Sequence, residues 1–344
     1  MDYRQKILNL NNRYNPEASR QVQERMFSAD SIWDSDVIKY VRRAMSPVDI
    51  DYTRKTKEAG ENVKQHLKEV LFNVSYEYQG SVMTNTHIKG ASDIDLLVIC
   101  EKFYGTDIHK VRQELQNAWK YDYFQRSRLE TYNRNFSAYD GNSSSDLAEL
   151  RRQIEQVMMR KYMKCDTSKA KAVKITNQNL HRDVDIVTSS WFQSLDFVLN
   201  GMPEELRGIK IYNKDLGYAE GPDYPFLGIH KINKKDDDSN GKLKRMIRFL
   251  KNVRKDSDKD IPLTSFEINA ICYSIPIDNY KYQNDKEIVS LLWNTMYNLW
   301  HDNKQDLLPS VVGDEYVFKG KPDKVAALKI LEDEVYKISK DLNA

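Results

Sequence analysis

The sequence predicts an α+β fold, in which a small mixed sheet with bracing helices precedes a lobe made of helices. Short runs with the apolar or alternating pattern of strands lie in the first and middle parts of the chain, at residues 75–78, 94–99, 170–176 and 183–188. Beyond about residue 203, apolar residues recur at the three- and four-residue spacing of helices, over residues 243–254, 267–273, 288–300 and 324–342. Hydrophobic residues make up 40% of the 344 residues, which is enough for a buried core.

Capping signals locate the helices that surround the first strands. Asn15 and Ser46 each stand directly before a proline, an arrangement suited to the first turn of a helix. The helix after Ser46 should continue to about Leu71, because one apolar stripe runs along it at helical spacing. A further amphipathic helix is expected over residues 147–158.

This pattern divides the chain into three parts. We expect N-terminal helices over residues 1–45 that pack with the helical lobe, a core of strands and helices over residues 46–203, and a C-terminal helical lobe over residues 204–344. The polar stretch at residues 234–241 predicts a surface loop, and its three consecutive aspartates at 236–238 are expected to face water.

Charge and cysteine usage exclude several classes of protein. Lys and Arg number 53 against 51 Asp and Glu, so bulk charge indicates neither a membrane partner nor a nucleic-acid activator. The three cysteines lie far apart, which is typical of a reducing compartment and excludes a disulfide framework. No apolar run approaches the ~20 residues of a membrane span, so we expect a soluble, cytoplasmic protein.

Two acidic residues interrupt an otherwise apolar strand. Asp93 and Asp95 alternate with Ile94 and Leu96, and alternation along a strand places both carboxylates on one face. Two adjacent carboxylates repel each other, and a divalent cation with oxygen ligands, Mg²⁺ or Mn²⁺, would relieve that repulsion. An exposed strand whose acids face water is the alternative.

A second acidic strand favours the metal site. The Asp-apolar-Asp pattern returns at Asp183 and Asp185, and Asp185 is the preferred third ligand because apolar residues flank it on both sides. Asp183 is the second choice, since it follows Arg182 at the strand edge. Three carboxylates can hold two ions, an arrangement suited to phosphoryl-group chemistry.

Two further segments could bind a triphosphate. Gly80-Ser81 precedes the paired acids, and glycine allows close approach of the backbone to phosphate, while the serine hydroxyl and amides can bond it. Residues 243–254 form a helix with one apolar face beside a basic stripe, and Lys251 lies near the border between them. The stripe is consistent either with a cleft that binds phosphate or with a solvated charged face.

These segments resemble the DNA polymerase β nucleotidyltransferase superfamily, and within it the cGAS/DncV-like nucleotidyltransferases (CD-NTases) of bacterial antiphage (CBASS) signalling. The resemblance covers most of residues 46–275 and rests on Gly80-Ser81, Thr84, Thr86-His87-Ile88, Ser92-Asp93-Ile94-Asp95 and Val184-Asp185-Ile186-Val187. Asn85 stands where that family commonly has glycine, and Asn is the next best residue for a left-handed backbone. No zinc-binding insertion is present.

The resemblance implies a polymerase β-like core and a specific set of roles. It makes Asp93, Asp95 and Asp185 the catalytic acids and the ligands of two divalent ions. Gly80, Ser81, Lys251, Ser265 and Phe266 would bind the nucleotide, with Lys251 on the donor triphosphate and Phe266 as the stacking aromatic. A serine before a helix is otherwise often only a cap, and a phenylalanine usually belongs to the core.

The implied function is template-independent synthesis of a cyclic di- or trinucleotide from NTPs. By the same resemblance, the product would be a second messenger for a separate effector protein, and regulatory or conjugating CBASS proteins would be further partners. A polymerase β-like transferase that modifies an antibiotic, an RNA end or a protein shares the metal motif and is the enzymatic alternative. A catalytically silent nucleotide-binding scaffold is the second alternative.

Overall fold

The structure is a computed structural model that describes residues 1–14, 34–88 and 94–344. Two of the sequence predictions lie outside these residues, namely the helix expected to open at Asn15 and the acid Asp93. The chain forms two compact units that are each discontinuous in sequence. The first comprises Met1–Thr53, Ser81–Ser92 and His230–Ala344, and the second comprises Arg54–Gly80 and Asp93–Ile229. The predicted limits at residues 46 and 204 stay a prediction.

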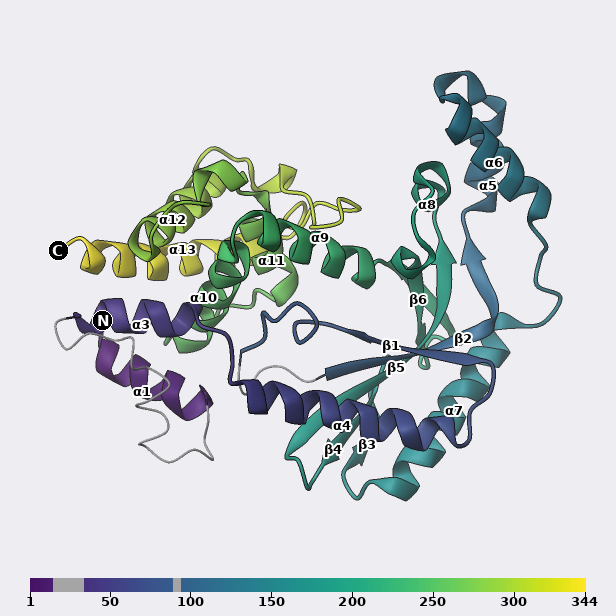
Figure 1. Ribbon diagram of the computed structural model, residues 1–344, viewed down its shortest axis with the longest axis horizontal. Helices are drawn as coiled ribbons and strands as arrows, with labels where there is room; N and C mark the ends of the chain where they lie inside the picture. The colour runs from purple at the N-terminus through teal and green to yellow at the C-terminus, as the bar shows by residue number, and fades with distance from the viewer. Residues whose placement is uncertain (15–33, 89–93) are drawn as a thin grey trace. The chain divides into compact units, whose positions relative to one another are not determined.

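The second unit is built on a seven-stranded mixed sheet (Figure 1). Its strands run in the order β1(Val74–Gln79), β2(Ile94–Thr106), β5(Arg182–Gln193), β4(Val173–Asn177) and β3(Cys165–Asp166). The strand β6(Gly208–Asn213) pairs with the far half of β5, and β7(Tyr218–Asp223) pairs with β6. Among the described strands, only β2 and β5 pair in parallel, whereas the other pairs are antiparallel. The predicted mixed sheet is therefore confirmed.

Helices brace this sheet. The long helix α4(Ile50–Lys68) lies against β1, where Gly60 permits close packing because a Cβ there would be 2.8 Å from the Tyr78 ring. α4 begins later than the predicted start at Ser46, since the side chain of Asp49 accepts the backbone N–H groups of Asp51 and Tyr52 and so caps the helix. The expected helix at 147–158 is confirmed as part of α7(Ser143–Lys161).

Three short helices of the second unit form a satellite cluster of their own. They are α5(Ile108–Gln116), α6(Tyr123–Asn135) and α8(Leu195–Asn200). Their buried side chains include Val111, Leu129 and Leu199, and together they form a separate apolar cluster. The sequence analysis did not predict α5 or α6, because their apolar stripes are short.

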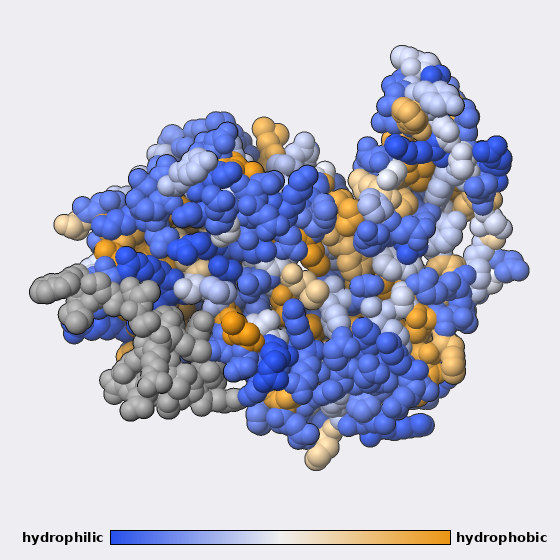
Figure 2. Space-filling model, in the orientation of Figure 1, coloured by the Kyte–Doolittle hydropathy of each residue, from blue (hydrophilic) through white to orange (hydrophobic). Residues whose placement is uncertain are grey.

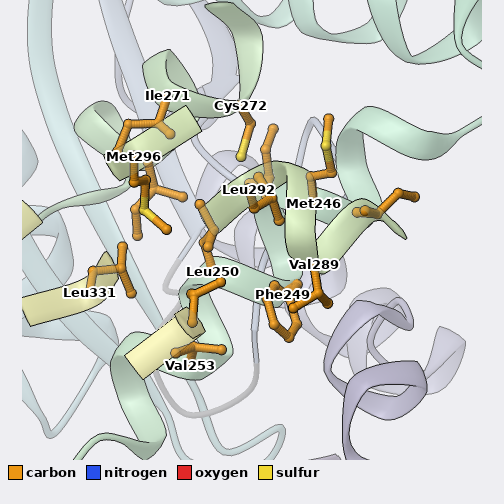
Figure 3. Close-up of a cluster of buried hydrophobic side chains, with 14 of the residues drawn as sticks. Met246, Phe249, Leu250, Val253, Ile271, Cys272, Val289, Leu292, Met296 and Leu331 are labelled. Carbon is orange, nitrogen blue, oxygen red and sulfur yellow. The ribbon is translucent and has the colours of Figure 1, made fainter. Parts of the chain in front are cut away.

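The first unit is helical, with a single large apolar core. It contains α1(Tyr3–Tyr14), α3(Asp36–Met45), the end of α9(Pro225–Asp238), α10(Lys242–Asp256), α11(Ser265–Ser274), α12(Asp285–His301) and α13(Pro322–Leu342). Figure 3 shows side chains of α10, α11, α12 and α13 meeting in this core, among them Leu250, Ile271 and Leu292. Each fully buried Leu or Ile contributes roughly 1.5–3 kcal/mol to folding, so the core fixes the position of α10.

Two expectations for the C-terminal half are wrong. Strands β6 and β7 follow residue 203, where only helices were expected, because each strand is six residues long and β7 carries little apolar signal. The stretch at residues 234–241 is largely the end of α9. Asp236 within it is buried at 7% exposure, where it accepts the N–H of Lys244, while Asp237 and Asp238 are exposed as expected.

None of the helices in the described part of the chain combines the length and apolar character of a membrane span. Hydrophilic side chains cover most of the face in Figure 2, with apolar residues in small scattered groups.

Candidate active site

Two of the predicted acids lie side by side on adjacent strands of the sheet of the second unit. Asp95 of β2 is the direct register partner of Asp185 of β5, and the two strands run parallel. Both side chains are half-buried, whereas Ile94 and Val184 beside them are fully buried on the opposite face. The alternation of a strand thus brings two carboxylates onto one face of the sheet.

Gly80 lies against the first of these acids. It follows the end of β1 with φ of +86°, directly after the register pair Gln79–Asp95. A Cβ on this residue would be 2.6 Å from Oδ2 of Asp95, far inside van der Waals contact. Only glycine satisfies both the left-handed backbone and this close approach.

The neighbouring basic and acidic groups distinguish Asp185 from Asp183. The Lys169 ammonium lies 3.4 Å from Oδ1 of Asp185. Asp183 instead accepts the Thr176 hydroxyl at 2.7 Å and pairs with Lys174 at 3.0 Å, both on β4. The Asp183 carboxylate is therefore bonded to side chains of β4, and Asp185 is the acid of β5 that lies beside Asp95.

The donor set suits a hard divalent cation. Carboxylate oxygens on one face are the ligands that Mg²⁺ and Mn²⁺ prefer. Among the described residues, no group of three or more His, Cys, Asp or Glu side chains forms a metal-binding cluster, and Asp93, the third predicted ligand, lies outside them. The two described acids, Asp95 and Asp185, fit the predicted site.

The loop that follows Gly80 belongs to the first unit. Its backbone closes on itself, since the Thr86 N–H donates to the Ser81 carbonyl at 2.9 Å. The hydroxyls of Thr84 and Thr86 lie 2.8 Å apart, and the Thr84 hydroxyl donates to the Ser81 carbonyl at 3.2 Å. Asn85 has φ of +54°, so it adopts the left-handed conformation expected for it in place of glycine.

Lys251 of α10 reaches this loop from the core. It is 2% exposed, and its ammonium donates to the carbonyl and the hydroxyl of Thr86 at 3.1 and 3.3 Å. Burial, and secondarily the charges of Arg254 and Arg248, lower the pKa of Lys251 to about 7. The reading of this stripe as a solvated charged face is therefore wrong at Lys251, and also at Arg248, which is 5% exposed.

Ser265 and Phe266 open helix α11. Thr264 is the cap of this helix, because its hydroxyl accepts the Phe266 N–H while the Glu267 carboxylate accepts the Thr264 N–H. Ser265 is half-buried and Phe266 is 40% exposed. Ser265 is thus not the cap and Phe266 is not a core residue, which removes the two ordinary explanations for their presence.

Within each unit the predicted residues gather into a local arrangement. Gly80, Asp95 and Asp185 lie together in the second unit, and the loop at 81–88 is bonded to Lys251 in the first. Two residues that touch these groups were given no functional role from the sequence: Lys169, and Arg248, which was predicted only as part of the basic stripe. Arg248 carried a usable signal, because it stands one helical turn before Lys251, whereas Lys169 carried none.

Comparison with known proteins identifies the family. Residues 230–338 match the model of the cGAS/DncV-like nucleotidyltransferase C-terminal helical domain. A protein of Lachnospiraceae bacterium (strain RUG226), named c-di-GMP synthase, is 66% identical over 342 residues, which are 99% of each chain. The chain belongs to the cGAS/DncV-like nucleotidyltransferases. It is therefore a nucleotidyltransferase, as the motifs predicted.

Two solved CD-NTase structures agree with the fold over its whole length. The STING-associated CdnE c-di-GMP synthase from Capnocytophaga granulosa has a TM-score of 0.82 and 40% identity, and the match covers 100% of this chain and 99% of that one. A STING-associated CdnE c-di-GMP synthase from Flavobacteriaceae sp. has a TM-score of 0.88 and 34% identity, with 99% and 98% covered. The polymerase β-like α+β fold is confirmed. Enzymes of this family generally use divalent metals.

Proposed function

We propose that this CD-NTase is a template-independent synthase that converts GTP into cyclic di-GMP, a second messenger of antiphage defence. The observation that carries the proposal is the pairing of Asp95 with Asp185 across adjacent parallel strands, with Gly80 held against Asp95. The choice of guanine is supported by relatives at 66%, 42% and 36% identity that are named c-di-GMP synthases.

The acids would hold the metal. Asp93, Asp95 and Asp185 are the proposed ligands of two Mg²⁺ or Mn²⁺ ions, which would supply charge stabilisation on the phosphates and activation of the attacking hydroxyl. The Lys169 ammonium, 3.4 Å from Oδ1 of Asp185, offsets part of the charge of that carboxylate.

The other proposed residues orient the nucleotides. An acceptor ribose hydroxyl attacks the α-phosphorus of the donor GTP, a new P–O bond forms, the α–β phosphoanhydride bond breaks, and pyrophosphate leaves. The Gly80-Ser81 backbone and the Ser81 hydroxyl bind the donor phosphates, and the Lys251 ammonium and Ser265 hydroxyl bind the triphosphate tail. The exposed ring of Phe266 stacks on a base. In a second step of the same kind, the free ribose hydroxyl of the linear product attacks the α-phosphorus of that product's own triphosphate, which closes the ring and releases a second pyrophosphate.

The product implies a partner. Two structural relatives are described as STING-associated synthases, which supports a separate effector that senses a cyclic nucleotide. We place this protein upstream of such an effector, with regulatory or conjugating CBASS proteins as further partners.

The test is a product analysis. Purified protein is incubated with all four NTPs together and with each alone, with Mg²⁺ or Mn²⁺, and the products are identified by mass spectrometry beside an Asp95→Asn/Asp185→Asn control. We expect a phosphatase-resistant cyclic di-GMP from GTP alone, absent from the control. A cyclic product with other bases would overturn the guanine assignment only.

The remaining outcomes address the alternative functions. Transfer of a nucleotide to an added RNA, antibiotic or protein acceptor, with no cyclic product, would favour the acceptor-modifying transferase. Binding of GTP with no turnover under any condition would favour the silent scaffold.

A further inference from the structure

Two basic side chains of α10 donate hydrogen bonds to consecutive backbone carbonyls of the loop at residues 81–88. The Arg248 guanidinium donates through Nη1 to the Asn85 carbonyl at 2.8 Å. One turn later, Lys251 donates through Nζ to the Thr86 carbonyl at 3.1 Å. Both side chains are at least nine-tenths buried, so these hydrogen bonds form in a low-dielectric environment that strengthens them.

Arg248 also reaches a third segment of the first unit. Its Nε donates to the carbonyl of Met45, the last residue of α3, at 2.8 Å. Beside it, Asn252 donates to the Ala44 carbonyl at 2.9 Å. The planar fork of arginine therefore joins the end of α3, the loop at Asn85 and α10, which lie far apart in sequence.

The contact at Asn85 is transmitted to Ser81 by hydrogen bonds within the loop. Thr86, the next residue, donates its N–H to the Ser81 carbonyl, and its hydroxyl is paired with that of Thr84. The Thr84 hydroxyl donates to the same Ser81 carbonyl. A shift of the backbone at Asn85 or Thr86 is therefore a shift of Ser81.

We propose that Arg248 is a positioning residue for nucleotide binding, which holds the Ser81 loop on α10. This inference rests on the proposed function, in which Ser81 and Lys251 bind the donor phosphates. A Lys251 side chain bound to the triphosphate would give up part of its bonding to Thr86. Arg248 would keep its bonds to the loop, because its Nη1 and Nε already donate to the carbonyls of Asn85 and Met45.

The experiment compares full-length Arg248→Gln and Arg248→Lys with the wild type. The measurements are the Kd for GTP by calorimetry, KM and kcat for product formation, and hydrogen exchange of residues 81–88. We expect Arg248→Gln to weaken GTP binding at least tenfold, to lower kcat less than it raises KM, and to speed exchange in the loop. Arg248→Lys keeps the charge but not the fork, so it should recover only part of the loss.

Arg245→Gln is the matched control. Arg245 lies on the same helix one turn earlier and is about one-third exposed. Its side-chain bonds go to Asp285 at 2.5 Å and to Sδ of Met45 at 3.9 Å, and none of them goes to a described residue of the loop. It should leave the Kd and KM within twofold of the wild type, whatever it does to the melting temperature. If Arg248→Gln lowers the melting temperature but leaves Kd and loop exchange unchanged, the residue is only structural and the inference is wrong.

The binding measurement separates this inference from the proposed function. If the wild type binds GTP but makes no cyclic product, the proposed function fails, while the effect of Arg248 on Kd and loop exchange still decides the inference. A wild type that binds neither GTP nor ATP would overturn both.

Discussion

A Cβ atom added to Gly80 would lie 2.6 Å from Oδ2 of Asp95, in a backbone conformation with φ of +86°. The position of the Asp95 carboxylate therefore leaves no room for a side chain at residue 80. We expect Gly80→Ala to displace the Asp95 side chain and to lower the rate of product formation at least 100-fold. The left-handed backbone should add a stability loss of roughly 1 kcal/mol. Mass-spectrometric rates and thermal unfolding would measure the two effects.

Gly217→Ala is the control that separates the cost of a left-handed backbone from the effect of displacing Asp95. Gly217 lies in the same unit with φ of +74°, but no atom lies within 4 Å of a Cβ placed there. Its replacement should cost a similar amount of stability and leave the rate unchanged. Equal loss of activity in both variants would show that the approach of Gly80 to Asp95 has no catalytic importance.

The two acids of β5 should differ in their effect on catalysis. Asp185 is the register partner of Asp95, while Asp183 is bonded to Thr176 and Lys174 of β4. We expect Asp185→Asn to abolish product formation with little change in unfolding. Asp183→Asn should retain activity within tenfold and lose about 1 kcal/mol of stability with its hydrogen bonds. Pyrophosphate release and chemical denaturation report the two quantities, and a more severe catalytic loss at Asp183 would reverse the assignment.

The local part of this site could be predicted from the sequence. Asp95 and Asp185 each lie in a short strand pattern, and alternation alone fixes which face their side chains occupy. The left-handed conformation of Asn85 also follows from residue type. Such features depend only on a few neighbouring residues.

Burial that depends on distant segments could not be predicted. Arg248 and Lys251 look like a solvated stripe along α10, and they are buried because a loop 165 residues before Lys251 packs over them. Likewise, β6 is only six residues long, and its identity comes from pairing with the far half of β5. Tertiary contacts determine the burial of these side chains and the strand conformation of β6, and such contacts cannot be predicted from the local sequence pattern.

Lys251 should make the stability of the protein depend on pH. Burial lowers its pKa from the ordinary 10.5 to about 7. Between these values the unfolded chain binds a proton that the native lysine has released, so raising the pH through this range favours the native state. The free energy of unfolding should gain about 1.4 kcal/mol for each pH unit from this group.

The test compares Lys251→Met with the wild type in denaturant titrations between pH 7.5 and 9.5. Other groups titrate equally in both proteins, so the difference between the two slopes isolates the lysine. The wild type should gain stability between pH 7.5 and pH 9.5 through Lys251, and the variant should lack this gain. The stability of the variant relative to the wild type should therefore be higher at pH 7.5 than at pH 9.5. Parallel slopes would mean that Lys251 stays protonated through its bonds to Thr86.

Asp236 should contribute to stability although it lies in a run of three aspartates. It is 7% exposed, accepts the N–H of Lys244 at 2.8 Å in the first turn of α10, and pairs with the Lys244 ammonium at 3.3 Å. It thereby satisfies an N–H that the helix itself leaves unpaired, next to the positive end of the helix dipole.

Asp236→Ala should therefore destabilise the protein by about 2 kcal/mol, which combines the loss of a cap with the loss of a partly buried ion pair. Asp237→Ala and Asp238→Ala are matched controls in the same turn, and because both residues are exposed they should change stability by less than about 0.5 kcal/mol. Denaturant titrations of the three variants decide the matter. Since α10 carries Arg248 and Lys251, we also expect Asp236→Ala to weaken GTP binding, whereas the other two variants should not. Equal stabilities of the three variants would show that the Asp236 cap does not stabilise α10.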